Sequence, residues 1–375
     1  MTARLVVASI LVAMGIASVI WTTRPTRPAA DVAASARPAT IERASLPIIE
    51  LRGPGTAIGR EHGRQLREQI RLLYENYLRK WYANEDAYKQ ALGRAARFRD
   101  HLLPEHRAEL QALADAAGIR FDAAMLANSF LDLSHVEACS TIALPAEASP
   151  DGVPRLGRNL DFPSLEIADK HSVLFIVHPR DRYAFAAVGW PGMIGVLSGM
   201  NEHGLAVANM EVPGAGNLPR AMPYILLYRM VLERCKTVDE ALALLDTTPR
   251  QTVNNLMIMD AAGNRAVAEI TPREVVVRRG LAGTALIGTN HQRGQDQDRP
   301  GLCGRYDLLH EAARKDFGRI DVAALERMLD KVAQGHMTMQ SMVFEPVGRL
   351  IYLAAGAEAT RRAYQRIDLA AHFKP

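Results

Sequence analysis

Cysteines are scarce in this sequence. Only Cys139, Cys235 and Cys303 occur among 375 residues, and no two of them form a Cys-x-x-Cys pair. A small, odd number argues against a disulfide framework of the kind that holds small secreted domains together. We predict that Cys235 and Cys303 are buried apolar thiols, and a disulfide between them is the alternative if the protein is exported.

Motifs for metals, cofactors and phosphates are also missing. The eleven histidines include no His-Glu-x-x-His sequence and no Cys/His cluster at ligand spacing. No Gly-x-Ser-x-Gly elbow and no phosphate-binding glycine loop occurs. Basic residues exceed acidic ones by only 45 to 41, without a Lys/Arg run that could follow a phosphate backbone. We therefore expect no metal, no cofactor and no nucleic-acid partner.

Apolar residues are plentiful, at 48% of the chain, and begin with an unbroken apolar or small run from Leu5 to Trp21. Arg4 and Arg24 flank this run, which is at the short end for a membrane span of ~20 residues. The nearest small-x-small site, Ala34–Ala36, is too far away for a typical signal cut. We expect residues 1–24 to be an uncleaved anchor, with a cleaved signal peptide as the alternative. The protein would then be periplasmic or extracytoplasmic, tethered to the inner membrane by residues 5–21.

Three further regions follow the apolar run. Residues 25–45 are rich in Pro, Ala, Arg and Thr and read as a linker. Residues 46–138, here called the pro-segment, show helical spacing and little strand-like alternation. Pro104 is placed to begin a helix that ends near Gly118. Residues 139–375, here called the body, change to a strand-rich texture.

Short β-branched and aromatic runs in the body, separated by Gly and Pro, predict strands. We expect strands at 140–144, 156–162, 172–178, 183–189, 193–198, 205–212, 254–259, 266–270, 275–278, 285–288, 342–345 and 350–354. Helices are expected at 219–235, 238–245, 306–315 and 322–332. Strands in this order, interrupted twice by a pair of helices, predict antiparallel sheets with helices packed outside.

The boundary between the pro-segment and the body carries the chemistry. Cys139 begins the sequence Cys-Ser-Thr-Ile, and a hairpin would return Arg158 and Asp161 to its side. Residues three apart face opposite sides of a straight strand, so one of the pair must lie at a turn or bulge. An arginine beside a thiol favours the thiolate, and a carboxylate can hold an α-ammonium if Cys139 becomes a chain terminus. The alternative is a buried cysteine beside a structural ion pair.

These motifs resemble those of the N-terminal-nucleophile hydrolases that act on linear amide C–N bonds, such as choloylglycine hydrolases and penicillin acylases. The closest likeness is to the acyl-coenzyme A:6-aminopenicillanic acid acyltransferase family. It extends over about residues 48 to 356 and rests on segments in the family's order. These are Glu50–Gly53, Ile58–Gly63, Cys139–Ser140, Arg158–Asp161, Gly199–Leu205, Thr289–His291 and Arg305–Tyr306.

The resemblance implies a four-layer αββα fold of α+β class and a precursor that cuts itself between Ala138 and Cys139. Cys139 would then be the nucleophile, with its own α-amine as the base. Arg158 would lie beside the thiol, and Asp161 would hydrogen-bond the amine. The helical pro-segment would remain bound as a separate chain, because its apolar faces need a partner.

Three further positions follow from the same resemblance. Asn290 would donate to the tetrahedral oxyanion, and Arg305 would stabilise the site and help to position Asp161 or Cys139. Asn209 is the candidate for a second oxyanion donor, although an ungapped match places Glu211 there. In the Gly199–Leu205 segment, a turn between strands is the favoured interpretation of Asn201 and His203.

The function expected from these residues is hydrolysis of an N-acyl amide, or transfer of its acyl group, through an acyl-Cys139 intermediate. The partner would be a small-molecule N-acyl amide or acyl donor. One alternative is a membrane-anchored, non-enzymatic binding protein on the same fold. Another is a cysteine protease of a different fold, with His171 or His291 as the base.

Overall fold

The computed structural model describes residues 46–134, 138–214, 221–294 and 301–374. The predicted anchor and the linker, residues 1–45, lie outside these ranges. Within them, none of the helices has both the length and the apolar character that crossing a membrane requires.

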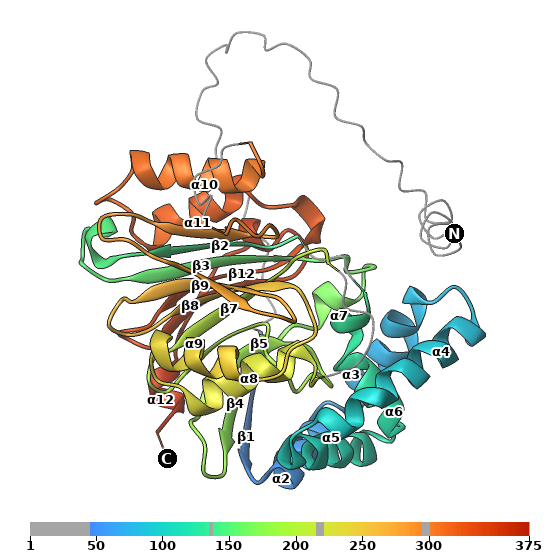
Figure 1. Cartoon of the computed structure of the whole chain (residues 1–375). Coiled ribbons are helices and arrows are strands. Elements are labelled where there is room, and N and C mark those ends of the chain that lie inside the picture. Colours follow the sequence, from blue (N-terminus) through green and yellow to red (C-terminus); the bar gives the residue numbers. More distant parts are fainter. Residues whose placement is uncertain (1–45, 135–137, 215–220, 295–300, 375) are drawn as a thin grey trace.

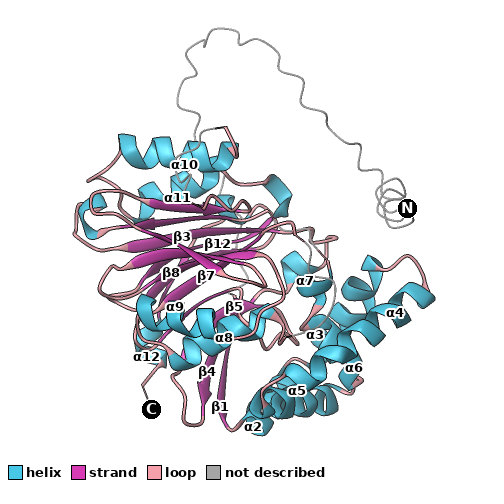
Figure 2. Ribbon diagram, in the orientation of Figure 1, coloured by secondary structure: helices cyan, strands magenta, loops and turns pink. Residues whose placement is uncertain are grey.

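The body consists of four layers, with two stacked sheets between two pairs of helices (Figure 1). In Figure 2 the magenta strands form the two central layers and the cyan helices cover their outer faces. The expected αββα architecture is therefore confirmed. The covering helices are α8 (Tyr224–Arg234), α9 (Val238–Thr247), α10 (Gly304–Lys315) and α11 (Val322–Lys331).

The six-stranded sheet has the order β11-β2-β3-β12-β13-β14, and all its neighbours are antiparallel. Helices α10 and α11 cover its outer face (Figure 1). The strands are β2 (Ser140–Leu144), β3 (Arg155–Asp161), β11 (Leu286–Thr289), β12 (Thr338–Glu345), β13 (Leu350–Ala355) and β14 (Gln365–Asp368). A short helix, α12 (Leu369–His372), follows β14.

The eight-stranded sheet has the order β1-β4-β5-β6-β7-β8-β9-β10, and only the β1–β4 pair is parallel. Its strands are β1 (Ile48–Gly53), β4 (Val173–Pro179), β5 (Phe185–Gly189), β6 (Ser198–Asn201), β7 (Ala206–Glu211), β8 (Asn254–Met259), β9 (Arg265–Ile270) and β10 (Val275–Arg279).

Burial on both faces explains the composition of the central strands. Every residue of β2, β3, β7, β8 and β9 is buried, because each sheet lies against the other sheet on one face and against helices on the opposite face. Strand β8 is accordingly a largely apolar run. Strand β3 also buries polar side chains, among them Arg155 and Asp161, which make hydrogen bonds inside the fold. A separate core between the six-stranded sheet and its helices contains Ile142, Leu144, Leu325, Leu329 and Val343.

The pro-segment forms a helical lobe beside the body (Figure 1). Its helices are α2 (Gly55–Gln65), α3 (Arg67–Leu72), α4 (Glu85–Ala96), α5 (Pro104–Ala117), α6 (Phe121–Ala127) and α7 (Phe130–Leu133). The expected helix does begin at Pro104, and it ends at Gly118, whose φ of 71° is the left-handed conformation that glycine adopts easily.

Glycine allows α2 and α5 to pack with their backbones in near contact. A Cβ at Gly59 would lie 1.9 Å from the carbonyl oxygen of Glu109, and one at Gly63 would lie 2.5 Å from that of Leu113. Both positions lie on one face of α2, four residues apart. Any larger residue there must therefore push the two helices apart.

A buried charge cluster joins the lobe to the body. Arg229 of α8 donates two hydrogen bonds of 2.7 Å to Glu109 of α5, and its Nε donates to Glu233 at 2.8 Å. The imidazole of His106 lies 3.3 Å from Glu233. These side chains are at most 3% exposed. Because each charge has an opposite partner, the cluster fixes α5 against α8 without leaving an unpaired buried ion.

The prediction of a pro-segment without strands is wrong. Ile48–Gly53 forms β1, which pairs in parallel with β4 of the body from Ile48 opposite Leu174 to Gly53 opposite Pro179. Only Leu51 of this edge strand is buried, so its sequence lacks the alternation that marks a half-buried strand. The distant strand β4 supplies its hydrogen-bonding partners.

The expected and observed strands differ at two other places. Residues 193–198, expected as a strand, belong mostly to the loop between β5 and β6, and β6 itself begins only at Ser198. Met193 and Leu197 of that loop line a pocket described below, and Ile194 and Val196 are buried in the core. Strand β14 was missed because its four residues are mostly polar and sit at a sheet edge.

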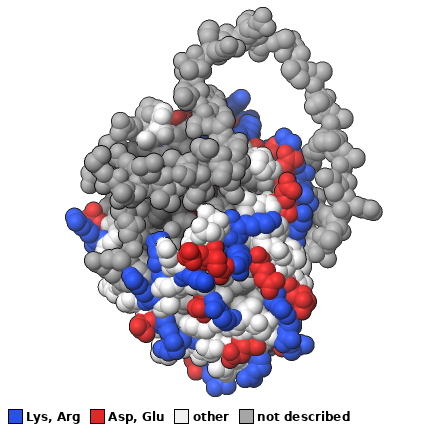
Figure 3. Space-filling model, turned by 90° about the vertical axis from the view of Figure 1, so that its right-hand side faces the viewer, with Lys and Arg blue, Asp and Glu red and all other residues white. Residues whose placement is uncertain are grey.

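The face that the helical lobe presents carries charges of both signs (Figure 3). Basic and acidic side chains are interspersed there, and some are paired, as Arg64 with Glu61 at 2.6 Å and Arg120 with Asp122 at 3.1 Å. No patch of a single charge sign covers the described part of this face. That mixture is typical of a solvated surface rather than of one that follows a nucleic-acid backbone.

Candidate active site around Cys139

Cys139 directly precedes β2 and is fully buried. The β2–β3 register places Thr141 opposite Arg158, so the expected hairpin returns the arginine to the cysteine. The Arg158 Nη2 lies 3.5 Å from Cys139 Sγ, within hydrogen-bonding distance for sulfur. A buried guanidinium at this distance favours the anionic form of the sulfur.

Backbone carbonyls hold the Arg158 side chain in place. Its Nη1 donates to the carbonyl oxygen of Asn209 and, at 3.5 Å, to that of Leu197. Among the described residues, its hydrogen-bond acceptors are therefore two neutral carbonyls and the thiol. Since no carboxylate is bound directly to it there, its charge acts on the thiol. Burial raises the pKa of Asp161, and the same charge opposes that rise.

Asp161 is the last residue of β3. Its Oδ1 accepts a 2.5 Å hydrogen bond from Thr338, and its backbone oxygen accepts one of 3.0 Å from the N–H of Ala138. Oδ2 lies 3.9 Å from Arg305 Nη1 and makes no hydrogen bond among the described residues. Burial raises the pKa of Asp161 to about 7, against the opposing effects of Thr338 and Arg305.

The predicted irregularity beside Asp161 exists, but it lies in the neighbouring strand. Asp161 pairs with Thr338 and Leu160 pairs with Gln340, so Met339 is an extra residue in β12. Such a bulge bends the ladder and redirects side chains locally. The bulge lies opposite the end of β3, between the residues that pair with Leu160 and with Asp161.

Arg305 connects the remaining predicted residues. Its Nη1 donates to the carbonyl oxygen of Cys139 at 2.5 Å and to Ser140 Oγ at 3.0 Å, while Nη2 donates to Asn290 Oδ1 at 3.0 Å. Arg305 is the second residue of α10, where the helix dipole disfavours a cation. Its position therefore reflects these contacts rather than helix stability.

The second oxyanion donor stays a prediction. Asn209 and Glu211 are two residues apart in β7, so their side chains share one face of the strand. The carbonyl oxygen of Asn209 binds Arg158, whereas that of Glu211 accepts a 2.7 Å hydrogen bond from Asn290 Nδ2. The structure thus places Glu211 beside Asn290, but only the Asn209 side chain has an amide N–H to donate.

The histidines proposed as alternative bases do not hydrogen-bond the thiol in the described part of the chain. Burial lowers the pKa of His291, as do the charges of Arg305 and Arg293. Burial also lowers the pKa of His171. A Cys–His pair requires hydrogen-bond reach between the two side chains, so this geometry favours Arg158 as the polar neighbour of Cys139.

Asn201 and His203 form the expected turn. Asn201 Oδ1 accepts hydrogen bonds from the backbone N–H groups of His203 and Leu205, and its Nδ2 donates to the carbonyl oxygens of Leu232 and Cys235. The side chain of Asn201 is therefore fully used in connecting β6 with β7 and α8. Cys235 and Cys303 are free, buried thiols, as predicted.

An apolar pocket next to Asp161 was not anticipated. Its empty space, together with the open solvent at its mouth, is about 680 Å³. Leu160 and Phe162, on either side of Asp161, and the bulge residue Met339 form one wall. The pocket is lined by Leu73, Tyr74, Tyr77, Leu78, Ala127, Phe130, Leu131, Leu160, Phe162, Ala168, Trp190, Pro191, Met193, Leu197 and Met339.

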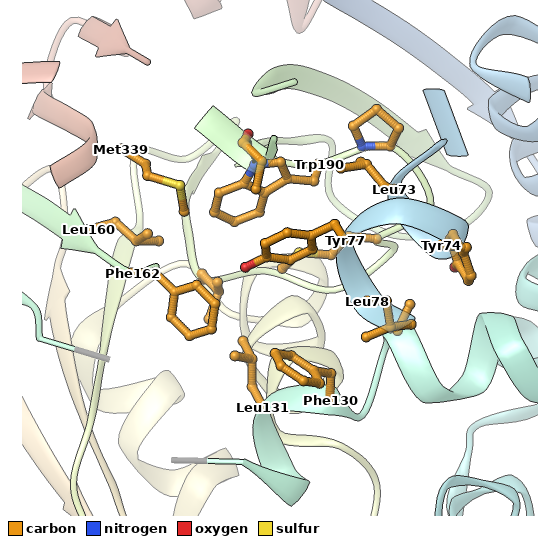
Figure 4. Close-up of a pocket in the computed structure, with 15 residues that line it drawn as sticks. Leu73, Tyr74, Tyr77, Leu78, Phe130, Leu131, Leu160, Phe162, Trp190 and Met339 are labelled. Atoms are coloured by element: carbon orange, nitrogen blue, oxygen red, sulfur yellow. Dashed lines mark hydrogen bonds between the residues drawn. The ribbon is translucent and has the colours of Figure 1, made fainter. Parts of the chain in front are cut away.

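The pro-segment supplies nearly half of this lining. Figure 4 shows Tyr77 pointing into the pocket from the pro-segment, with Phe162 and Leu160 on the strand side and Trp190 above. Tyr77 Oη donates to the carbonyl oxygen of Pro163 at 2.9 Å, which orients the ring. The sequence signal for this wall is an apolar stripe at helical spacing, which cannot be told from ordinary core.

The chain matches the model of a known protein family. The model described as "Acyl-coenzyme A:6-aminopenicillanic acid acyl-transferase" matches residues 148–346, more than half of the chain. The matched range contains Arg158, Asp161, Asn290 and Arg305 and begins beyond Cys139. An uncharacterized protein of Archaeoglobus fulgidus is 21% identical over 266 residues, which are 62% of this chain and 44% of that protein. This chain therefore spans less than half the length of the curated relative that it matches.

Several solved structures are similar to this chain. A mutant of the conjugated bile acid hydrolase of Clostridium perfringens matches 62% of this chain and 93% of its own, with 18% identity and a TM-score of 0.44. The N-acylethanolamine-hydrolyzing acid amidase ortholog of Caenorhabditis elegans matches 61% and 100%, with 17% identity and a TM-score of 0.46. Penicillin V acylase of Agrobacterium tumefaciens matches 58% and 83%, with 16% identity and a TM-score of 0.43.

Proposed function

The chain belongs to the acyl-coenzyme A:6-aminopenicillanic acid acyltransferase family, and on that premise we propose that it is a self-activating cysteine enzyme. Cys139 cuts the peptide bond that precedes it and then attacks the carbonyl carbon of an N-acyl amide. The observation that carries the proposal is a set of contacts on both sides of the Ala138–Cys139 bond. Arg158 contacts the Cys139 thiol, the backbone oxygen of Asp161 accepts from the N–H of Ala138, and Arg305 donates to the carbonyl oxygen of Cys139.

The first step converts a peptide bond into a thioester. Cys139 Sγ attacks the carbonyl carbon of Ala138, the C–N bond breaks, and the α-amine of Cys139 takes up a proton. Water then hydrolyses the thioester, which leaves a carboxylate on Ala138 and restores the thiol. The buried Asp161 Oδ2 has no hydrogen-bond donor in the described residues of the uncut chain, which supports the view that it later binds the new α-ammonium.

The mature reaction would use the same groups on a substrate. The α-amine of Cys139 removes the thiol proton, and Sγ attacks the acyl carbon of the amide. The amine part of the substrate leaves with that proton, and an acyl-Cys139 thioester remains. Water releases a carboxylic acid, or an amine takes the acyl group. Asn290, oriented through its Oδ1 by Arg305, is the proposed donor to the oxyanion, and Asn209 is the second candidate.

The pocket beside Asp161 supports an apolar acyl group as the part of the substrate that is recognised. Its lining contains aromatic, aliphatic and thioether side chains and no charged residue. An apolar chain that enters it gains roughly 0.8 kcal/mol for each buried CH₂ group. Both the pro-segment and the body line the pocket, so a pro-segment that stays bound after the cut belongs to the proposal.

A membrane-anchored binding protein is the competing proposal, with the same pocket but an unreactive Cys139. The apolar run of residues 5–21 supports a tether to the inner membrane, outside the cytoplasm, in both cases. Fractionation of cells and protease treatment of intact spheroplasts test the tether: a chain that stays in the soluble fraction, or resists external protease, contradicts it.

Autocleavage is the decisive test of the enzyme proposal. Wild type and Cys139→Ala are purified, and their intact masses and new N-termini are determined. We expect the wild type to divide into two chains, the second beginning Cys-Ser-Thr-Ile, and the variant to remain whole. Ser140→Ala is the matched control, because it alters the neighbouring hydroxyl, which contacts Arg305, but keeps the thiol.

Turnover of N-acyl amides completes the test. A wild type that remains a single chain, and whose Cys139 is not labelled by iodoacetamide, favours the binding protein. If the wild type is cut but releases no amine from a panel of N-acylated amines, the proposed substrate class is contradicted. The proposal of self-cleavage still stands in that case.

A further inference from the structure

A loop of the body is held by side chains of the pro-segment. Residues Trp190–Leu197 connect β5 to β6. The N–H of Gly192 donates to His62 Nε2 at 3.0 Å. The carbonyl oxygen of Gly192 accepts a 2.8 Å hydrogen bond from Asn128 Nδ2 and a 3.4 Å one from Tyr74 Oη. Both polar groups of this peptide therefore find their partners in the lobe.

The contact requires a glycine on one side and tightly placed side chains on the other. Gly192 has a φ of +88°, and a Cβ there would lie 2.8 Å from the Tyr74 ring. Asn128 is fully buried, and its Oδ1 also accepts a 2.8 Å hydrogen bond from the N–H of Ile194. One amide side chain therefore hydrogen-bonds both a carbonyl oxygen and an N–H group of the loop.

His62 acts in this contact as a neutral acceptor. It is 1% exposed, and its ring centroid lies 4.7 Å from that of Phe175. Burial and, to a smaller degree, the charge of Arg229 lower the pKa of His62 to about 3. An uncharged imidazole leaves Nε2 free to accept from Gly192. Gly59 and Gly63, which bring α2 against α5, fix the helix that carries it.

The same loop shapes the apolar pocket and reaches the active site. Trp190, Met193 and Leu197 line the pocket, and Trp190 Nε1 donates to the carbonyl oxygen of Ala168 at 2.8 Å. At the end of the loop, the carbonyl oxygen of Leu197 accepts from Arg158 Nη1. A displacement of Gly192 would therefore move the pocket wall first, and Arg158 only through the rest of the loop.

We propose that His62 and Asn128 are positioning residues that set the depth of the apolar pocket, and with it the length of the acyl chain that the enzyme accepts. The inference rests on the proposed function and adds selectivity to it. The pro-segment determines which amides bind, while Cys139 and its neighbours determine how fast a bound amide reacts.

The test compares His62→Leu, which removes the acceptor but keeps bulk, with His62→Gln, which restores an acceptor. His106→Leu is the matched control, because His106 is an equally buried histidine of the lobe that contacts Glu233 and not the loop. Each cleaved variant is assayed on coumarin amides whose saturated acyl chains range from acetyl to palmitoyl.

For His62→Leu we expect KM for the best wild-type substrate to rise at least about tenfold, a shift in the preferred chain length, and a kcat within about threefold. His62→Gln should keep the wild-type profile. Iodoacetamide should label Cys139 at the wild-type rate in all of them. An unchanged profile in His62→Leu, or the same shift in His106→Leu, overturns the proposal.

A second readout does not depend on turnover. In a chain with Trp21 and Trp81 replaced by Phe, Trp190 is the remaining tryptophan. Its emission should shift to the red in His62→Leu and not in His62→Gln. An unchanged emission contradicts the proposal that His62 positions the Trp190–Leu197 loop, even if no amide is turned over. If His62→Leu does not fold, His62→Gln decides: a wild-type chain-length profile supports the proposal and an altered one overturns it.

Discussion

The carboxyl group of Asp161 should make the uncut chain less stable as the pH rises. The perturbation is Asp161→Asn in a chain that already carries Cys139→Ala, so that the peptide bond stays intact. Burial raises the pKa of Asp161 in the folded chain to about 7, whereas an unfolded Asp titrates near ~3.9. Between these values the folded state binds a proton that the unfolded state lacks, so the free energy of unfolding falls with pH.

The size of the effect follows from the two pKa values. A difference of one bound proton changes the free energy of unfolding by about 1.4 kcal/mol per pH unit. From pH 5 to pH 7, Cys139→Ala should therefore lose roughly 2 kcal/mol relative to the chain with Asp161→Asn. The contribution is present in full below pH ~4 and is lost as the pH passes 7.

Urea unfolding of both chains at several pH values between 5 and 8 measures this difference. Buried histidines act in the opposite direction, because a folded state that excludes a proton loses stability as the pH falls, as for His62. Both chains share these histidines, so the gap between the chains isolates Asp161. Parallel stability curves would refute the reasoning, since they would mean that Asp161 is ionised in the uncut chain at pH 5.

Two packing predictions concern the contact between the lobe and the body. Gly59→Ala would place a Cβ against the carbonyl oxygen of Glu109 and should lower the free energy of unfolding by about 2 to 3 kcal/mol in chemical denaturation. The control, Gly93→Ala, has open space around it and should be neutral or stabilising by up to about 1 kcal/mol. Equal effects of the two substitutions would contradict the close packing. Arg229→Met leaves Glu109 and Glu233 as buried charges without their partner and should cost about 3 to 5 kcal/mol; a loss under about 1 kcal/mol in calorimetry would show that the cluster is not needed.

Local signals account for the elements that the sequence predicted well. Strand β8 has its predicted bounds because Asn254–Met259 is a largely apolar run between polar turns. Helix α9 begins after Thr237, whose side chain caps the N–H of Glu240 at 3.2 Å. In these segments the residues that specify the structure are neighbours in the chain, so a linear pattern suffices.

Elements that depend on distant partners were not predictable in the same way. The extra residue Met339 exists only relative to the pairing of β12 with β3. The cluster around Arg229 reads from sequence as an exposed helix face, because Arg229 and Glu233 stand four residues apart, the usual spacing of surface ion pairs. Its burial depends on Glu109, which lies far away in the chain.

The candidate site was predicted by type but not in its contacts. Sequence and resemblance named Cys139, Arg158, Asp161, Asn290 and Arg305, which the structure brings together. They did not reveal that Arg305 holds the Cys139 carbonyl and Asn290 at once. The pocket was missed entirely, because its walls come from segments that meet only in the folded chain.

The pairing of β1 with the body affects how the protein would refold after the proposed cut. Six residues from the beginning of the pro-segment complete the edge of the body's larger sheet, so the fold is assembled from sequence on both sides of Cys139. While the chain is whole, β1 and β4 pair within one chain. If the Ala138–Cys139 bond is cut as proposed, recovery from denaturation requires an encounter between two chains, and its yield should depend on protein concentration. The cut would thus make the folded state hard to regain, and the intact precursor would be the form in which folding is efficient.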